Sequence, residues 1–237
     1  MQETLKESSH DIQDENSPGK IFLIDKPLDF TSFDIVRIFK KSFNLKKAGH
    51  SGTLDPKATG LLIICSDKKT KKINEFIEYD KEYEGIIRIG ATTKSFDTES
   101  EEANISHSVN ISDEEIENVR KSFLGEVEQM PPMYSAIKHK GKPLYKMARK
   151  GHEIERAMRK IFVSDFVVKK LNDTEIFFRI SSSKGTYIRS IANDFGERLG
   201  VGGYLKELRR TRVGKFELEG LDEEVKGIRF KILDFGF

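Results

Sequence analysis

The stretch Gly49-His50-Ser51-Gly52-Thr53-Leu54-Asp55-Pro56-Lys57-Ala58-Thr59-Gly60 places three glycines, a histidine and an Asp-Pro pair within a dozen positions. Glycines allow a backbone to turn sharply and to approach a ligand closely. Proline favours an extended conformation in the residue before it, so the Asp55 carboxylate can project from the loop into a cleft. An isolated Asp-Pro is more often a simple turn, and a lone histidine such as His50 is more often structural. The surrounding sequence must therefore decide between these interpretations.

Strand and helix patterns continue on both sides of this loop. Residues 20–25 have the apolar character of a strand that Pro27 ends, and residues 31–43 have the apolar period of a helix. Directly after the loop, the apolar run 60–65 predicts a buried strand, and residues 83–90 predict another. The loop is thus expected to enter a buried strand of a sheet.

The second half of the chain mixes strands and helices without the regular spacing of a parallel doubly wound sheet. Ser112 and Glu115 form a capping box for a helix that extends to about Phe123. The patterns farther along predict strands over 162–168 and 175–180, a helix over 186–199 that Gly200 ends, and a short helix over 204–210. This order predicts an α+β fold.

Composition excludes several classes of protein. Apolar residues make up 37% and charged residues 34%, which is typical of a globular protein with a charged surface. We find neither a bilayer-spanning segment nor a signal peptide, and expect a cytoplasmic protein with no membrane contact. The single cysteine, Cys65, cannot form an internal disulfide or a zinc cluster, so no metal is expected. Residues 1–18 are poor in apolar residues and are predicted to be a disordered tail, which leaves residues 19–237 as one domain.

Opposite charges are segregated along the chain. Residues 138–160 contain nine Lys or Arg against two Glu, an excess of seven positive charges. Residues 203–215 contain five Lys or Arg against one Glu, whereas residues 95–120 contain eight acidic residues and one Arg. A single basic run is usually a solvated face, but two such runs on one chain favour a polyanionic partner.

The sequence resembles the TruB family, whose signature G-H-x-G-T-L-D-P-x-A-x-G-L-L surrounds a catalytic aspartate and matches residues 49–62. Other blocks match the family in the same order over about residues 19–217. They are Asp80-Lys81-Glu82-Tyr83, Gln129-Met130-Pro131-Pro132, Ser183-Lys184-Gly185-Thr186-Tyr187-Ile188-Arg189-Ser190 and Leu208-Arg209-Arg210-Thr211. Four ordered blocks make a chance match remote.

The resemblance implies a pseudouridine synthase fold, with a central mixed, largely antiparallel sheet flanked by helices. It implies that a uridine of the tRNA T-arm loop, uridine-55, is isomerised to pseudouridine without a cofactor. Asp55 would be the nucleophile or the base, and the sequence does not choose between these roles. Arg189 would form a buried pair with Asp55 and oppose the rise of its pKa. Tyr83 would stack on the uracil, and Leu208 would form an apolar wall.

The same resemblance implies how RNA is held. The target uridine must leave its stack, and His50 would fill the space left by flipped bases. The basic stretch 138–160 falls where the family has an insertion that closes on the RNA stem-loop, and its charges should bind phosphates. The residues that we assign to RNA binding are His50, Leu208, Lys138, Lys140, Lys142, Tyr145, Arg149, Lys184, Tyr187, Arg209 and Arg210.

Two departures and two alternatives accompany this prediction. About twenty residues follow Phe216, so the small C-terminal RNA-binding domain common in bacterial members is expected to be missing. The resemblance extends to Thr93 and Asp97, but the segment Asp97-Thr98-Glu99-Ser100 lacks the glycine usual after this aspartate, so Asp97 matches the family less closely than Asp55 does. One alternative is a guide-RNA-dependent synthase that needs protein partners; the other is a non-catalytic tRNA-folding chaperone. The favoured interpretation is a monomeric enzyme with no obligatory protein partner.

Overall fold

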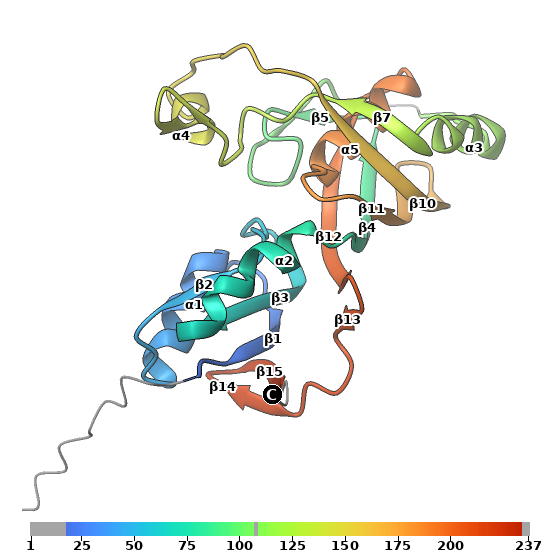
Figure 1. Cartoon of the computed structure of the whole chain (residues 1–237). Helices are drawn as coiled ribbons and strands as arrows, with labels where there is room; N and C mark the ends of the chain where they lie inside the picture. Colours follow the sequence, from blue (N-terminus) through green and yellow to red (C-terminus); the bar gives the residue numbers. More distant parts are fainter. Residues whose placement is uncertain (1–17, 107–108, 234–237) are drawn as a thin grey trace, which may run out of the picture.

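The computed structural model describes residues 18–106 and 109–233, which form an α+β fold around one large sheet (Figure 1). The sheet has the order β14 (Glu223–Val225), β15 (Ile228–Leu233), β1 (Ile21–Lys26), β3 (Ala58–Ser66), β12 (Gly203–Val213), β4 (Lys81–Ile89), β11 (Glu175–Ser182), β10 (Arg159–Asn172) and β7 (Gly125–Gln129). Strands β12 and β3 pair in parallel, and the other pairs along this path are antiparallel. The predicted α+β class with a mixed, largely antiparallel sheet is confirmed.

Strands β12 and β4 join two halves of the molecule (Figure 1). One half holds α1 (Ser32–Ser42), the 3-10 helix η1 (Asp67–Lys72), α2 (Ile73–Glu78) and the short strands β2 (Ala48–His50) and β13 (Phe216–Glu217). The other half holds α3 (Asp113–Lys121), α5 (Ile188–Arg198) and the small pair β5 (Thr92–Thr93) and β6 (Glu102–Ala103). Strands β8 (Lys138–His139) and β9 (Lys142–Pro143) and helix α4 (Leu144–Ala148) lie on an excursion from this second half.

Three hydrophobic cores hold these elements. The largest lies between α3, α5 and the strands β4, β10, β11 and β12. Strands β1 and β3 bury side chains on both faces, and on one face Phe22, Phe39, Phe43 and Phe230 pack ring against ring at centroid distances of 5.0–6.1 Å. Full burial of one such ring contributes roughly 1.5–3 kcal/mol. This cluster fixes α1 against the sheet, next to β3, the strand that follows residues 51–57.

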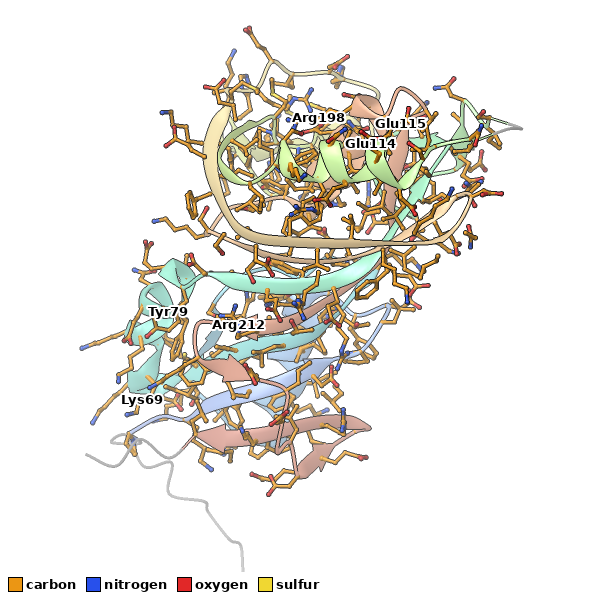
Figure 2. The ribbon with its side chains drawn as sticks, turned by 90° about the vertical axis from the view of Figure 1, so that its right-hand side faces the viewer. Lys69, Tyr79, Glu114, Glu115, Arg198 and Arg212 are labelled. Carbon is orange, nitrogen blue, oxygen red and sulfur yellow. The ribbon has the colours of Figure 1, made fainter. Side chains whose placement is uncertain are left out.

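The helix starts follow from local sequence. Thr31 caps α1 and exchanges hydrogen bonds with Asp34, and Ser112 caps α3 and exchanges them with Glu115. Each cap satisfies backbone N–H groups that lack partners inside the helix, an effect of about 1 kcal/mol. In Figure 2, Arg198 of α5 lies beside α3, and its guanidinium stands 3.9 Å from the Phe123 ring centroid. The predicted helices over 31–43, 112–123 and 186–199 are confirmed to within a few residues.

The predicted short helix over 204–210 is wrong, because these residues belong to strand β12. Pairing with β4 on one side and β3 on the other gives this segment ladder hydrogen bonds that local sequence does not reveal. Two bulges, at Leu205/Glu207 and Arg210/Arg212, break the simple alternation by which a strand is recognised. Helix α5 crosses β12 so closely that a Cβ on Gly196 would stand 2.1 Å from the Gly203 nitrogen.

The chain after β12 adds β14 and β15 to the outer edge of β1. Within residues 18–106 and 109–233, no helix is long and apolar enough to cross a membrane. The predicted disordered tail falls almost wholly on residues 1–17, which lie outside the described part of the chain. The single domain predicted over 19–237 stays a prediction.

Candidate active site

The loop of residues 51–57, here called the Asp55 loop, connects β2 to β3 and is fixed at several points. Ser32 Oγ accepts a hydrogen bond from Leu54 N (2.8 Å) and donates one to Leu54 O (3.1 Å). The Asp29 N–H donates to Pro56 O (2.9 Å), and the Ala58 N–H donates to Asp55 O (3.0 Å). Both α1 and the turn before it therefore hold the loop in place.

Strand β12 closes the other side of the loop. Gly60 has φ +102°, and a Cβ there would stand 2.3 Å from Arg210 O. The Arg210 side chain is buried, and its Nε donates to Leu61 O (2.7 Å) while Nη2 donates to Gly52 O (3.3 Å). In the fold, the Arg210 guanidinium thus bonds one carbonyl of the Asp55 loop and one of β3, and its predicted contact with RNA stays a prediction.

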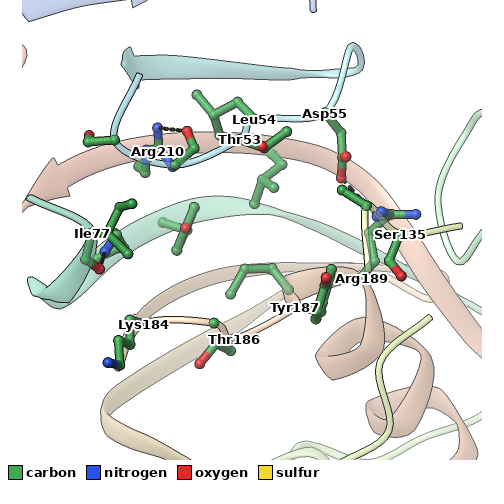
Figure 3. A pocket seen from close by; sticks show the side chains of 18 of the residues that line it. Thr53, Leu54, Asp55, Ile77, Ser135, Lys184, Thr186, Tyr187, Arg189 and Arg210 are labelled. Carbon is green, nitrogen blue, oxygen red and sulfur yellow. Dashed lines mark hydrogen bonds and ion pairs between the residues drawn. The ribbon is translucent and has the colours of Figure 1, made fainter. Parts of the chain in front are cut away.

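A pocket of about 280 Å³ opens between the Asp55 loop, β4, β12 and the segment before α5 (Figure 3). Asp55 points from its loop toward Arg189, and Thr186 and Tyr187 lie across the pocket. The cationic lining residues are Lys81, Arg159, Lys184, Arg189 and Arg210, whereas Asp55 is the acidic one. The pocket thus combines one carboxylate with several positively charged side chains, a surface that attracts an anionic ligand.

Arg189 stands between two carboxylates. Its Nε lies 2.9 Å from Asp55 Oδ2 and 3.5 Å from Asp97 Oδ2, as ion pairs whose angles fall outside hydrogen-bond geometry. Its Nη1 donates to Ser95 O (3.0 Å) and its Nη2 to Tyr134 O (2.7 Å). The Arg189 side chain is 6% exposed and that of Asp55 is 36% exposed. The structure therefore contains the predicted Asp55–Arg189 pair, with a buried cation and a carboxylate open to the pocket.

The pKa of Asp55 is raised above the ordinary value of an aspartate. Burial is the largest cause, Arg189 opposes it, and the negative charge of Asp97 adds to it. Arg189 therefore favours the ionised form of Asp55, the form that a carboxylate needs to act as a nucleophile or base.

Asp97 is a site residue that the sequence only partly indicated. Its carboxylate is 5% exposed, and Oδ1 accepts hydrogen bonds from Ser95 Oγ (2.5 Å) and the Glu99 N–H (2.9 Å). These donors aim the other oxygen at Arg189. In the sequence, Asp97 was indicated by its place in the family resemblance, without the glycine usual after it, and its contact with an arginine 92 positions later depends on the fold.

Tyr83 and Leu208 both line the pocket, as predicted for stacking and for an apolar wall. Tyr83 is buried on β4, opposite Arg210 in the β4–β12 register, and it also belongs to the largest core. Leu208 lies opposite Gly85, and its side chain packs partly against the same core. Their roles toward a bound base stay predictions.

His50 lies at the end of β2, where its Nδ1 accepts a hydrogen bond from the Gly52 N–H (3.3 Å). Burial, and then the nearby charge of Arg210, lower its pKa, so the ring is neutral at pH 7. A neutral half-buried imidazole is consistent with packing against a base rather than binding a phosphate.

The other predicted RNA-binding residues fall into three places. Lys184 and Tyr187 line the pocket mouth, where Lys184 pairs with Glu78 and Tyr187 lies under Arg159. Arg209 faces the opposite side of the sheet and pairs with Asp25 (2.8 Å), away from the pocket. The remaining residues lie on the excursion that carries α4, namely Lys138, Lys140, Lys142, Tyr145 and Arg149.

The sequence analysis did not assign two buried lysines, Lys26 and Lys81, to the site. Lys26 Nζ donates to Pro27 O (2.9 Å) and Phe30 O (2.7 Å), and burial lowers its pKa to about 8. Lys81 Nζ donates to Ile77 O (2.6 Å) and Tyr79 O (2.5 Å) at the end of α2, and burial, followed by the charge of Arg210, lowers its pKa to about 8. A lysine in sequence gives no sign that it will be buried. Among the described residues, no three His, Cys, Asp or Glu side chains gather as ligands for a metal ion.

Comparison with known proteins identifies the family. Residues 40–188 match the model described as TruB family pseudouridylate synthase, N terminal domain, and residues 189–226 match the tRNA pseudouridylate synthase B C-terminal domain. The chain belongs to the TruB family. The predictions of the family, of its fold and of a pseudouridine synthase are thereby confirmed.

Relatives of similar length share nearly half of the sequence. A protein from Chloroherpeton thalassium named tRNA pseudouridine synthase B is 49% identical over 220 residues, which cover 91% of each chain. One of the same name from Chlorobium chlorochromatii is 46% identical over 211 residues, covering 87% of this chain and 83% of that one. Among solved structures, a chain of a Cbf5–Nop10–Gar1 complex is 32% identical with a TM-score of 0.66, over 84% of this chain and 50% of that one.

Proposed function

We propose that the enzyme isomerises uridine-55 in the T-arm loop of tRNA to pseudouridine, with Asp55 as its catalytic carboxylate. The observation that carries this proposal is the Asp55–Arg189 pair at the pocket, with Asp55 reaching into it and Arg189 buried behind. The relatives named tRNA pseudouridine synthase B are 44–49% identical, against 27–32% for chains from the Cbf5 complexes. This difference favours a tRNA substrate over a guide-dependent one.

The reaction is an isomerisation and balances within the nucleotide. The bond between N1 of uracil and C1′ of ribose breaks, the base turns, and a bond forms between C5 and C1′. The proton on C5 is lost and N1 gains one, so no reductant or co-substrate is consumed. Asp55 acts on the ribose or on the base as its bond breaks, and Arg189 keeps the carboxylate ionised for either role.

The uridine must leave its stack before Asp55 reaches it. Tyr83 and Leu208 receive the uracil between them, and the neutral His50 fills part of the space that the base vacates. The basic arm, which we define as residues 138–156, binds phosphates of the stem-loop and makes affinity fall with salt. We further propose that the enzyme is cytoplasmic and works as a monomer without an obligatory protein partner.

The test uses the purified chain and an unmodified tRNA transcript, without added protein or cofactor. Pseudouridine is mapped by carbodiimide labelling and reverse transcription, with Asp55→Asn as the matched variant. A stop at the T-loop uridine that disappears in the variant supports the proposal. A stop at another position would contradict the assigned uridine, and tight binding without modification would favour a partner-dependent enzyme.

A chaperone activity is the second candidate, because the basic arm binds RNA apart from the chemistry. Refolding of a misfolded tRNA transcript by Asp55→Asn, at the rate of the unaltered enzyme, would show that this activity exists independently of Asp55. Loss of refolding together with modification would leave isomerisation as the sole function.

A further inference from the structure

Three large apolar side chains lie exposed within six residues before and at the start of α1. Leu28 is 50% exposed, Phe30 37% and Phe33 64%, and we call them the apolar ridge. Exposed aromatic rings gathered in one short segment mark a binding surface more often than isolated apolar residues do. The ridge is separate from the pocket that holds Asp55, because none of its three residues lines that pocket.

The ridge is fixed to the Asp55 loop by direct bonds. Asp29, which lies between Leu28 and Phe30 in sequence, donates its N–H to Pro56 O (2.9 Å) and pairs through its carboxylate with Lys57 (2.7 Å). Ser32, beside Phe33, bonds both backbone groups of Leu54. The ridge therefore has a fixed position relative to the loop that carries Asp55.

The exposure of Phe33 follows from the way α1 is anchored. The Thr31–Asp34 cap fixes the first turn, and the buried face of α1 carries Ile35, Val36 and Phe39, so Phe33 points away from the core. The Arg37 guanidinium stands 5.9 Å from its ring centroid. An exposed aromatic ring beside a cation, on a helix turn that a cap fixes, is the kind of surface on which nucleic acid bases stack.

We propose, resting on the proposed function, that the apolar ridge binds unpaired nucleotides of the RNA loop next to the target uridine, through stacking on Phe33 and Phe30. Flipping the target base unstacks its neighbours and exposes their faces. Because the ridge is bonded to the loop that carries Asp55, its rings can stack on these exposed bases while the uridine occupies the pocket. Such stacking tolerates any base, so the ridge adds affinity for an opened loop and not for a sequence.

A second copy of the chain fits the ridge less well. Aromatic side chains bury about 150–250 Å² each, so the two partly exposed rings together with Leu28 offer roughly 300 Å², against about 800 Å² per partner in a stable interface. Charged groups border the ridge on both sides, as Asp29 and Lys57 and as Asp34 and Arg37. A small apolar strip with a charged border suits a few bases better than a protein surface.

The test compares Phe33→Ala with Leu171→Ala, which removes a 47% exposed apolar side chain at the far end of β10. Binding of a T-arm stem-loop and of its stem alone, as a duplex, is measured by fluorescence anisotropy. We expect Phe33→Ala to bind the stem-loop about 5- to 20-fold more weakly, as for loss of one stacked base. The duplex should bind unchanged, and Leu171→Ala should bind both RNAs like the unaltered enzyme. Phe33→Trp, which keeps a stacking face, should restore stem-loop binding.

Equal binding of the stem-loop by Phe33→Ala and Leu171→Ala, with equal thermal midpoints, would overturn the proposal. So would self-association of the unaltered enzyme in sedimentation that Phe33→Ala abolishes, because the ridge would then be a protein interface. Light-induced cross-linking of 5-iodouridine, placed at the unpaired loop positions, should map to the peptide that contains residues 28–37. If the unaltered enzyme modifies no tRNA, the proposed function is wrong. If it modifies tRNA and Phe33→Ala binds the stem-loop normally, only the proposal about the ridge is wrong.

Discussion

The Asp55 loop and the basic arm differ in how they are held. The loop is bonded to α1, to the turn before α1 and to β12, which are distant in sequence. The arm is held mainly by bonds among its own neighbours, such as Leu144 N–H to Ile137 O and Tyr145 N–H to Ser135 O. Its helix α4 stands apart from the main body in Figure 1. The proposed chemistry therefore rests on a preorganised scaffold, whereas the proposed contacts to RNA lie on a segment with few bonds to the rest of the fold.

Among substitutions in the Asp55 loop, Asp55→Asn should have the largest effect on the reaction rate. The substitution keeps the shape of the side chain but removes the ionisable group, so we expect pseudouridine formation to fall by at least about 10⁴-fold. Single-turnover assays on a tRNA transcript measure the loss, and filter binding should show affinity within a few fold. Residual activity above a hundredth of the original rate would contradict a catalytic role.

The two charges around Asp55 should shift its titration in opposite directions. Asp97→Asn removes a negative charge that raises the pKa of Asp55, so the acid limb of the rate profile should move to lower pH. Arg189→Gln removes the opposing cation and should move that limb to higher pH. The active form is the ionised carboxylate, so activity is lost as the pH falls through the pKa. We expect rate losses of about 10²-fold for each, since both also position Asp55.

These pH profiles separate electrostatics from simple misfolding. A variant that only loosens the site would lose rate at every pH without moving the acid limb. If both variants shifted the limb in the same direction, the assignment of opposite electrostatic effects would be wrong.

Two glycines offer a matched test of rigidity. Gly60→Ala places a Cβ 2.3 Å from Arg210 O at φ +102°, whereas Gly141→Ala in the arm has φ +80° and open space around the new atom. We expect Gly60→Ala to lower the free energy of unfolding by roughly 3–4 kcal/mol, because strain at positive φ adds to overpacking. Gly141→Ala should cost roughly 1–2 kcal/mol, from strain alone. Urea denaturation measures both, and equal losses would remove the proposed contrast.

Substitutions in the basic arm should have the smallest effect on the rate of the chemical step. Replacing Lys138, Lys140 and Lys142 by Ala removes three exposed charges without touching the pocket. We expect about tenfold weaker tRNA binding in moderate salt and a slope of log affinity against log salt that is smaller by about 2. The single-turnover rate at saturating enzyme should stay within a few fold. An unchanged salt slope would show that these lysines do not meet phosphates.

Sequence patterns predicted what depends on neighbouring residues. The cap at Ser112 is local, and so is the apolar run that becomes β3. The Asp55–Arg189 pair was predicted from a family resemblance, because no local pattern joins residues 134 positions apart. The contact of Asp97 with Arg189, the burial of Lys26 and the strand that replaced the helix over 204–210 could not be predicted, since they are made by partners from other elements.

The parallel ladder between β3 and β12 joins Ala58–Gly60 to Leu208–Arg210, across 150 positions of sequence. During synthesis, a nascent chain that has emerged only as far as α5 holds Asp55 and Arg189 but lacks the strand that braces the Asp55 loop. Contacts of such separation form slowly, because the entropy of closing the intervening loop opposes them. The geometry of the Asp55 loop therefore depends on residues 208–210, which are added to the chain 150 positions after the strand that they brace.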